Sequence, residues 1–312
     1  MNMNGKTENA LAGRLKKYIN NIEKVTKLTG DASIREYYRI FTGSGSMVAM
    51  VYPCSNSEEI ERIRTYTDLY RSHGLHVPEI VSQIGDDILI QDDIGDISLQ
   101  HYLSLASEED LLKVKVEIHS ILEQLKSIPR DQTIYIMDKN KIEFEINFFI
   151  ENFVKKLIPG WEKHDELFEE IIKNLNKLNK KRFFAHRDFH SRNIFFKNGD
   201  LFLIDFQDSL QAPEYYDTVS FVFDSYMKPE HSEYFFSLFK SRDDSEMEQI
   251  YLTAYQRNIK ALGTFGYQYD SGNKKFFNYI EPTINNLRRN ILYSEESLLS
   301  LLFLKFEESL QS

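Results

Sequence analysis

The chain has a single cysteine, Cys54, in 312 residues. A disulfide framework needs paired cysteines and a thiolate metal cluster needs several, so one chain can form neither. Long apolar runs are also missing, since none approaches the roughly 18 residues that a transmembrane helix requires. Residues 1–17 lack the apolar centre of a signal peptide. We therefore expect a cytoplasmic protein that does not bind membranes.

An excess of positive charge is absent as well. The formal net charge is −10, from 38 Lys and Arg residues against 48 Asp and Glu residues. Nucleic-acid binding would call for a basic patch or a Lys/Arg tract, and the sequence has neither. Hydrophobic content of 42% and charged content of 28% are ordinary for a globular protein. We expect a small-molecule partner and no nucleic acid, and nothing in the composition indicates an oligomeric state.

The most informative segment of the chain runs from Ala185 to Asp208. It contains Asp188, then Asn193 five positions later, then Asp205 after a short apolar hairpin. Phosphoryl transfer from ATP needs a carboxylate beside the attacking hydroxyl, and an amide oxygen and a second carboxylate that bind Mg²⁺. A polar loop with turn-capping residues would explain one of these features but not all three together. We predict a kinase that uses ATP and Mg²⁺, with Asp188 as the catalytic base and Asn193 and Asp205 as the metal ligands.

The hydrophobic pattern predicts a small sheet followed by a helical region. Strands are expected at residues 24–28, 37–41, 47–52, 79–84 and 87–92, with an opening helix at 10–19 and a second helix, capped by Ser57, that runs to about Ser72. Helices follow at 107–125, 142–154 and 166–178, with a last one opened by residues 294–296. This order predicts an α+β, bilobal protein-kinase-like fold. Residues 1–94 would form a small antiparallel-sheet N-lobe that covers the nucleotide, and residues 95–312 a larger, mainly helical C-lobe with the catalytic loop, metal and acceptor sites.

A loop between the first two expected strands is a candidate site for the nucleotide phosphates: Gly30, Asp31, Ala32 and Ser33. Glycine allows close backbone approach and the Ser33 hydroxyl can donate to phosphate, although an ordinary β-turn is the alternative. Arg35 and Arg39 follow on the next strand. One or both are expected at phosphate oxygens, with a surface ion pair as the alternative for each.

The third expected strand departs from the protein-kinase pattern. Protein kinases carry Val-Ala-Ile-Lys there, and the lysine contacts the phosphates, whereas this chain has Val48-Ala49-Met50-Val51. Either an arginine such as Arg35 replaces the lysine, or the protein is a catalytically silent nucleotide-binding pseudokinase. Replacement is favoured because the residues for Mg²⁺ and the acceptor are intact.

Asp217 begins an apolar helix twelve residues beyond Asp205. It is expected either to accept hydrogen bonds from the backbone of the catalytic loop or to cap its own helix.

The Asp188 to Asp208 segment resembles the aminoglycoside phosphotransferase and choline kinase superfamily of small-molecule kinases. Three further stretches, residues 30–39, 90–96 and 261–266, are similar to bacterial kinases that phosphorylate the anomeric hydroxyl of N-acetylmuramic acid and N-acetylglucosamine. The resemblance extends from about residue 26 to residue 290. It implies ATP-dependent phosphorylation of one or both sugars in the recycling of cell-wall peptidoglycan. It also implies that adenine binds backbone near Gln91, Asp92 and Asp93, and that the sugar lies between the catalytic loop and the late helices.

Candidate sugar contacts are chosen by their hydrogen-bonding chemistry: His190, Arg192, Gln207, Asp208, Asp224 and Arg257. The guanidinium of Arg192 or Arg257 suits the lactyl carboxylate of a muramic acid. Alternatively, Arg192 only stabilises the loop and Asp224 only pairs with a neighbouring helix. An aminoglycoside, choline or another amine is the alternative acceptor. The cation at Arg192, close to Asp188, favours a neutral or anionic acceptor instead.

Overall fold

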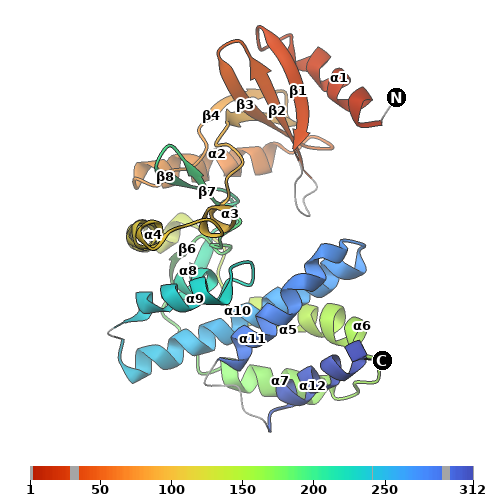
Figure 1. Ribbon diagram of the computed structural model, residues 1–312, viewed down its shortest axis with the longest axis vertical. Helices are drawn as coiled ribbons and strands as arrows, with labels where there is room; N and C mark the ends of the chain where they lie inside the picture. Colours follow the sequence, from red (N-terminus) through yellow and green to blue (C-terminus); the bar gives the residue numbers. More distant parts are fainter. Residues whose placement is uncertain (1–2, 29–34, 241, 290–295, 312) are drawn as a thin grey trace. The chain divides into compact units, whose positions relative to one another are not determined.

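The computed structural model describes residues 3–28, 35–240, 242–289 and 296–311 (Figure 1). It has an α+β fold, with a five-stranded antiparallel sheet in the N-terminal part and a mostly helical C-terminal part. The chain divides into two compact units. The first contains residues 1–97 and 195–207, and the second contains residues 98–194 and 208–312. The predicted functional boundary at residue 94 stays a prediction.

The sheet of the first unit has the strand order β1-β2-β3-β5-β4, and every neighbouring pair is antiparallel. Its strands are β1 (Ile22–Leu28), β2 (Glu36–Thr42), β3 (Gly45–Val51), β4 (Ile80–Ile84) and β5 (Ile88–Asp92). In the centre of the sheet Ala49 lies opposite Tyr38 on one side and Ile90 on the other. All five predicted strands are therefore confirmed, with ends that differ by one or two residues.

Two helices cover opposite faces of this sheet because side chains alternate along each strand. Helix α1 (Met3–Leu15) places Leu15 in a core with Ile40 and Ala49. Helix α2 (Ser57–Ser72) places Ile63 in a separate core with Leu89. The central strands β3 and β5 are consequently apolar on both faces.

A hairpin from later in the chain completes the first unit. It consists of β7 (Ile194–Lys197) and β8 (Asp200–Leu203), and residues 195–207 belong to the unit. The backbone N–H of Leu203 donates to the carbonyl of His76 at 2.8 Å. The ring of Phe206 lies 5.0 Å from that of Tyr70, at the end of α2. The segment that carries Asp205 is therefore attached to α2.

The second unit consists mainly of helices, with a small sheet of β6 (Phe183–Ala185) and β9 (Leu210–Ala212). Its helices before β6 are α3 (Leu99–Leu103), α4 (Glu108–Ser127), η1 (Arg130–Gln132), α5 (Lys139–Phe149), the π-helical η2 (Ile150–Val154), α6 (Lys155–Leu157) and α7 (His164–Leu175). Those after β9 are α8 (Tyr216–Val222), α9 (Pro229–Phe236), η3 (Ser237–Phe239), α10 (Asp244–Asp270), η4 (Lys274–Tyr279), α11 (Ile280–Arg288) and α12 (Leu298–Gln311).

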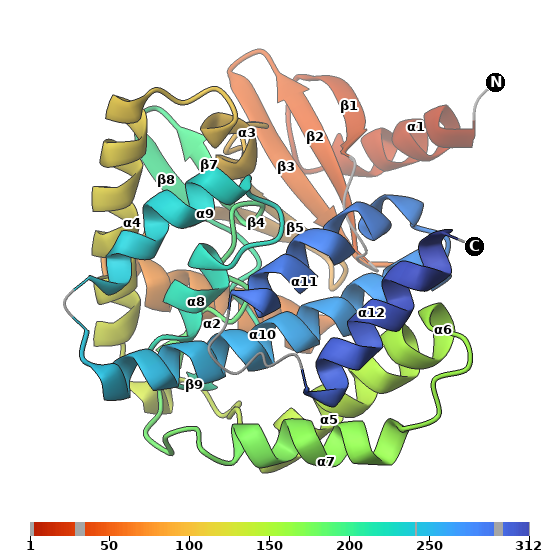
Figure 2. The ribbon, with the colours of Figure 1, turned by 60° about the horizontal axis from the view of Figure 1, so that its bottom comes forward.

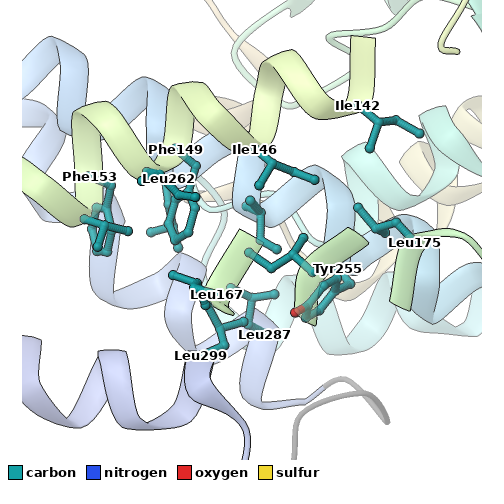
Figure 3. Packing of buried hydrophobic residues seen from close by; sticks show 14 of the residues in the cluster. Ile142, Ile146, Phe149, Phe153, Leu167, Leu175, Tyr255, Leu262, Leu287 and Leu299 are labelled. Carbon is teal, nitrogen blue, oxygen red and sulfur yellow. The ribbon is translucent and has the colours of Figure 1, made fainter. Parts of the chain in front are cut away.

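Helix α10 runs through the middle of this unit beside α5, α8 and α11 (Figure 2). Figure 3 shows the core that it shares with its neighbours, in which Phe149 of α5, Leu167 of α7 and Leu262 of α10 are each 0% exposed. Leu287 of α11 and Leu299 of α12 complete the same cluster. This burial fixes the position of α10, which carries Arg257 and Lys260, two charged residues beside Asp188.

Three local expectations were wrong or incomplete. The opening helix spans Met3–Leu15 rather than 10–19. Ser57 is the first residue of α2 and not its cap, since Asn56 precedes the helix and makes no capping bond. The helix expected at 142–154 changes to a π-helix at Ile150. Ser107, by contrast, caps α4 through a reciprocal bond pair with Asp110, and residues 294–295 lie outside the described residues. In the described ranges, every helix is too short or too polar to span a bilayer.

Candidate active site

The predicted catalytic loop follows β6 in the second unit, and two buried carboxylates anchor its backbone. Asp217 accepts hydrogen bonds from the backbone N–H groups of His186, at 2.7 Å, and Arg187, at 3.1 Å. Asp224 accepts one from the N–H of Ser191 at 2.8 Å. Buried N–H groups need partners, so these bonds determine the path of the loop. Asp217 therefore holds the loop and does not cap its helix, where Tyr215 occupies the capping position.

The loop contains a left-handed residue just before Asp188. Arg187 has φ +82°, which is costly for a residue with a side chain and is maintained by the bonds to Asp217. Phe189 is fully buried and contacts the ring of His186 edge-on. The Nδ2 of Asn193 donates to the carbonyl of Asp188 at 3.0 Å, which leaves the Asn193 amide oxygen as the atom able to bind a cation. The loop thus holds Asp188 and Asn193 in a defined arrangement.

Three cations surround the carboxylate of Asp188. The Nζ of Lys260 lies 2.9 Å from Oδ1, a guanidinium nitrogen of Arg257 lies 3.3 Å from Oδ1, and the Nε of Arg187 lies 3.7 Å from Oδ2. Burial alone would raise the pKa of Asp188, but these charges outweigh it and hold the pKa well below its ordinary value. Asp188 is therefore ionised at neutral pH.

Lys260 was not among the predicted site residues. It lies one helical turn after Arg257 on α10, and residues three apart on a helix share a face. The three-residue spacing from Arg257, a predicted sugar contact, was the feature of the sequence that could have indicated Lys260. Burial lowers the pKa of Lys260 to about 8, although Asp188 opposes the shift.

A cavity of about 90 Å³ opens beside these groups within the second unit. Its polar lining includes Asp188, His190, Asp224, Tyr226, Arg257 and Lys260. Burial lowers the pKa of His190 to about 3, so its ring is neutral at neutral pH. Three of the six predicted sugar contacts, His190, Asp224 and Arg257, thus line a common cavity.

The other three predicted sugar contacts lie elsewhere. The guanidinium of Arg192 stacks on the ring of Tyr226, 4.7 Å from its centre. Asp208 lies 3.6 Å from a guanidinium nitrogen of Arg187. Gln207 belongs to the first unit and donates from Nε2 to Oδ1 of Asp205 at 2.8 Å. None of the three lines the cavity described above.

The first unit holds the second predicted metal ligand, Asp205, in an unusual backbone conformation. Asp205 has φ +63°, a left-handed value that is rare for a residue with a side chain. A guanidinium nitrogen of Arg35 lies 3.3 Å from its Oδ1, and another lies 3.2 Å from Oε1 of Glu59. The side chain of Arg35 is 12% exposed. Arg35 is thus a largely buried cation held between two carboxylates.

The predicted adenine segment ends β5. Gln91 lies opposite Val48 in the sheet, and the N–H of Asp92 donates to the carbonyl of Glu79 at 2.9 Å. The carboxylate of Asp93 accepts from Arg39 at 2.6 Å, so Arg39 forms the ion pair that was its alternative interpretation. The chain then turns at Gly95, which has φ +85°. Gly30, Asp31, Ala32 and Ser33 lie outside the described residues.

The ligand chemistry of this site suits a hard cation. In the described part of the chain, His, Cys, Asp and Glu side chains form no cluster of three that would hold a metal by itself. Mg²⁺ does not need such a cluster, because it keeps several waters and takes one or two protein ligands together with phosphate oxygens. The amide oxygen of Asn193 in the second unit and the carboxylate of Asp205 in the first are each a ligand of this kind, so the chemistry of each residue by itself fits Mg²⁺.

Solved structures of two other proteins have the same fold as this chain. A thermostable mutant of aminoglycoside phosphotransferase APH(4)-Ia, in ternary complex with ADP and hygromycin B, has a TM-score of 0.65 and 14% identity, covering 91% of this chain and 98% of that one. Choline kinase LicA from Streptococcus pneumoniae has a TM-score of 0.62 and 17% identity, covering 91% and 99%. The predicted kinase-like fold is therefore confirmed.

The sequence profile described as "Phosphotransferase enzyme family" matches residues 24–256. The chain belongs to this family and is a kinase of the aminoglycoside phosphotransferase type. It is also similar to an N-acetylmuramate/N-acetylglucosamine kinase of Neisseria meningitidis, with 26% identity over 289 residues and 85% of each chain covered.

Proposed function

We propose that the protein transfers the γ-phosphoryl group of ATP to the anomeric hydroxyl of N-acetylmuramic acid, N-acetylglucosamine or both, in the recycling of peptidoglycan in the cytoplasm. The observation that carries the proposal is the cavity at Asp188, where a carboxylate lies among polar and cationic groups. The similarity to the neisserial kinase of these two sugars supports the choice of acceptor.

In this proposal Asp188 orients the sugar hydroxyl and accepts its proton. A bond forms between the sugar oxygen and the γ-phosphorus, the bond to the bridging oxygen of ADP breaks, and the proton goes to Asp188. Since the pKa of Asp188 is held low, it is a weak base. Most of the acceleration must therefore come from positioning and from neutralising phosphate charge.

The remaining roles concern the nucleotide. Asn193 and Asp205 each supply an oxygen ligand to Mg²⁺, which neutralises the phosphates when bound. Arg35, held beside Asp205, takes the place of the missing strand lysine. Residues 30–33 contact phosphates, and adenine contacts backbone near Gln91, Asp92 and Asp93.

The cavity disfavours a cationic acceptor such as choline or an aminoglycoside. Binding an amine beside Asp188 would require it to displace or face Lys260 and Arg257, whose nitrogens lie 2.9 and 3.3 Å from that carboxylate. An ammonium group bound at Asp188 would therefore lie close to both of these cations, and like charges so near each other repel strongly where water is scarce. A neutral or anionic sugar meets no such repulsion.

The test is Mg²⁺-dependent ADP release with N-acetylmuramic acid and N-acetylglucosamine, alongside choline and kanamycin, with ³¹P NMR to identify the phosphorylated oxygen. We expect turnover with one or both sugars and an anomeric phosphate as product. Asp188→Asn should lower kcat at least a hundredfold, within the range for loss of a general base. Asp131→Asn, which neutralises an exposed carboxylate of the same unit, is the control. Turnover of an amine alone would overturn the choice of acceptor, and no turnover at all would favour a pseudokinase.

A further inference from the structure

Within ion-pair distance of Asp188, cations outnumber carboxylates. Three cations, Lys260, Arg257 and Arg187, lie within 4 Å of Asp188, whereas Asp208 is the one other carboxylate within 4 Å of any of them among the described residues. Within 4 Å, three positive charges therefore face two negative ones, while Glu145 of α5 interacts with the same three cations from farther away. Asp224 also lines the cavity, but its carboxylate is bound by the backbone N–H groups of Ser191 and Tyr226, at 2.8 Å each.

The three cations differ in how firmly they are held. Arg257 also donates from Nε to the hydroxyl of Ser220 at 3.0 Å, and Arg187 also faces Asp208 at 3.6 Å. Lys260 contacts Asp188 through the end of a flexible chain with four methylene groups. Lys260 is therefore the cation that can move to a new partner with the least disturbance, while Arg257 and Arg187 stay beside Asp188.

Lys260 also faces the cavity, so a group on a bound acceptor can reach it. Its side chain is 12% exposed and stands on α10 between Arg257 and Thr264, which line the same cavity. A carboxylate in this partly desolvated position would gain more from an ammonium partner than it would in water.

We propose that Lys260 binds an acidic substituent of the acceptor and thereby sets the preference for a carboxylated over a neutral amino sugar. This inference rests on the proposed function for its choice of acceptors. When an acidic sugar binds, Lys260 exchanges the carboxylate of Asp188 for that of the sugar, and Asp188 loses one of three neutralising charges. The same exchange that binds the sugar makes Asp188 a better proton acceptor. When a neutral sugar binds, Lys260 stays paired with Asp188. Such a sugar therefore gains no ion pair, and Asp188 does not become a better proton acceptor.

The test compares N-acetylmuramic acid, which carries a lactyl carboxylate, with N-acetylglucosamine, which lacks it. The parent protein should have the lower KM for N-acetylmuramic acid. Lys260→Met, of similar length and without charge, should raise that KM at least tenfold and lower the ratio of kcat/KM values, acidic over neutral sugar, at least tenfold. Lys260→Arg should keep most of the preference. Lys113→Met removes one exposed lysine on α4 as a matched control and should leave both sugars unaffected.

Two results would overturn the inference. If Lys260→Met weakened turnover of both sugars by the same factor, Lys260 would act on Asp188 or on the transferring phosphoryl group rather than on the acceptor. If the parent protein bound both sugars equally in calorimetry without ATP, no acidic group would be recognised. Calorimetry also separates this inference from the proposed function, since binding that favours the acidic sugar and is lost in Lys260→Met supports the inference even where no phosphate is transferred. Lys260→Gln supplies a second neutral side chain if the Met variant does not fold.

Discussion

At the scale of single residues, the environment of Asp188 decides the chemistry. A carboxylate with cations 2.9 and 3.3 Å away is ionised but weakly basic, so it suits orienting a hydroxyl better than removing its proton early. An anomeric hydroxyl is more acidic than an ordinary alcohol, and a weak base is adequate for it. The proposed acceptor therefore matches the weakly basic carboxylate of Asp188.

The pH dependence of acceptor binding follows from Lys260. The pKa of Lys260 is lowered to about 8, so its ammonium form is lost as the pH rises through 8. The KM for N-acetylmuramic acid should rise above pH 8 in steady-state assays, while that for N-acetylglucosamine stays level.

Asp188 stays ionised and His190 neutral across this range. The charged groups that face Lys260 are Asp188 and Arg187 from the loop, Arg257 from α10 and Glu145 from α5.

The Lys260→Met variant should lack this rise, because it has no proton to lose. A parallel rise for both sugars in the parent protein would assign the effect to another group.

Arg35 offers a second test at the residue scale. Removing its guanidinium should raise the KM for ATP by a factor of about 10 to 150, the effect of losing one charge-assisted phosphate contact of about 1.5–3 kcal/mol. The measurement is kcat and KM for ATP in Arg35→Ala and Arg35→Lys, with the lysine restoring part of the affinity. Arg71→Ala in α2, whose ion pair with Glu79 is largely exposed, should change neither constant. An unchanged KM in Arg35→Ala would show that another group replaces the strand lysine.

At the scale of elements, the packing of α10 explains the glycines of the 261–266 stretch. A Cβ on Gly266 would lie 2.4 Å from the carbonyl oxygen of Asn152, and a Cβ on Gly263 would lie 2.9 Å from the Cα of Phe149. Both neighbours are backbone of α5 or η2 and cannot move aside. These glycines let two helices touch, and the same contact positions Arg257 and Lys260 at the loop.

Gly266→Ala should therefore destabilise the protein by about 3 kcal/mol, near the upper end of the usual overpacking cost. Gly13→Ala is the matched control, because an added Cβ there meets nothing within 4 Å. That change removes a flexible residue from the interior of α1 and should stabilise by about 0.5–1 kcal/mol. Chemical unfolding of the two variants gives both free energies, and equal effects would contradict the packing shown by the structure.

The bond between α8 and the catalytic loop can be tested through Asp217. In Asp217→Asn only the amide oxygen can accept, so one of the two loop N–H groups loses its partner at a cost of about 1–3 kcal/mol. We expect a Tm lower by several degrees and a kcat lower by about tenfold or more, because the loop shifts. Thermal unfolding and steady-state kinetics measure the two. Wild-type Tm with reduced kcat would mean that Asp217 acts on the reaction directly.

At the scale of the whole molecule, ligand binding should stabilise the fold through Mg²⁺. A ligand at a hundred times its Kd adds about 2.7 kcal/mol to the free energy of unfolding. ATP with Mg²⁺ should thus raise the Tm by several degrees, whereas ATP with EDTA should raise it much less, and EDTA should abolish turnover. Asp205→Asn, which removes one charged ligand, should lose most of the Mg²⁺-dependent part of the shift. An equal shift with and without Mg²⁺ would contradict the assignment of Asn193 and Asp205 as its ligands.

Much of the fold was predictable because it depends on neighbours in the sequence. Short apolar or alternating runs bounded by turn residues predict strands, and the five strands lie where this pattern places them. Site residues that lie close together in the sequence were as predictable as the strands. Asp188 and Asn193, five positions apart, are an example. The bond between Asn193 and the Asp188 carbonyl is a local one of this kind. Helix ends were less predictable, since the start of α2 at Ser57 depends on capping geometry rather than on composition.

The sequence alone determined the class of protein, because Asp188, Asn193 and Asp205 lie within one short segment whose spacing is typical of a kinase, and the family match bears out that class. Tertiary structure alone decided which groups surround that base. Lys260 lies 72 positions from Asp188 and Arg257 lies 69, and they reach it because α10 is packed into a core of apolar side chains far from the loop in sequence. No pattern within either segment encodes that approach, since it depends on the burial of the whole helix and on glycines that let α10 touch α5.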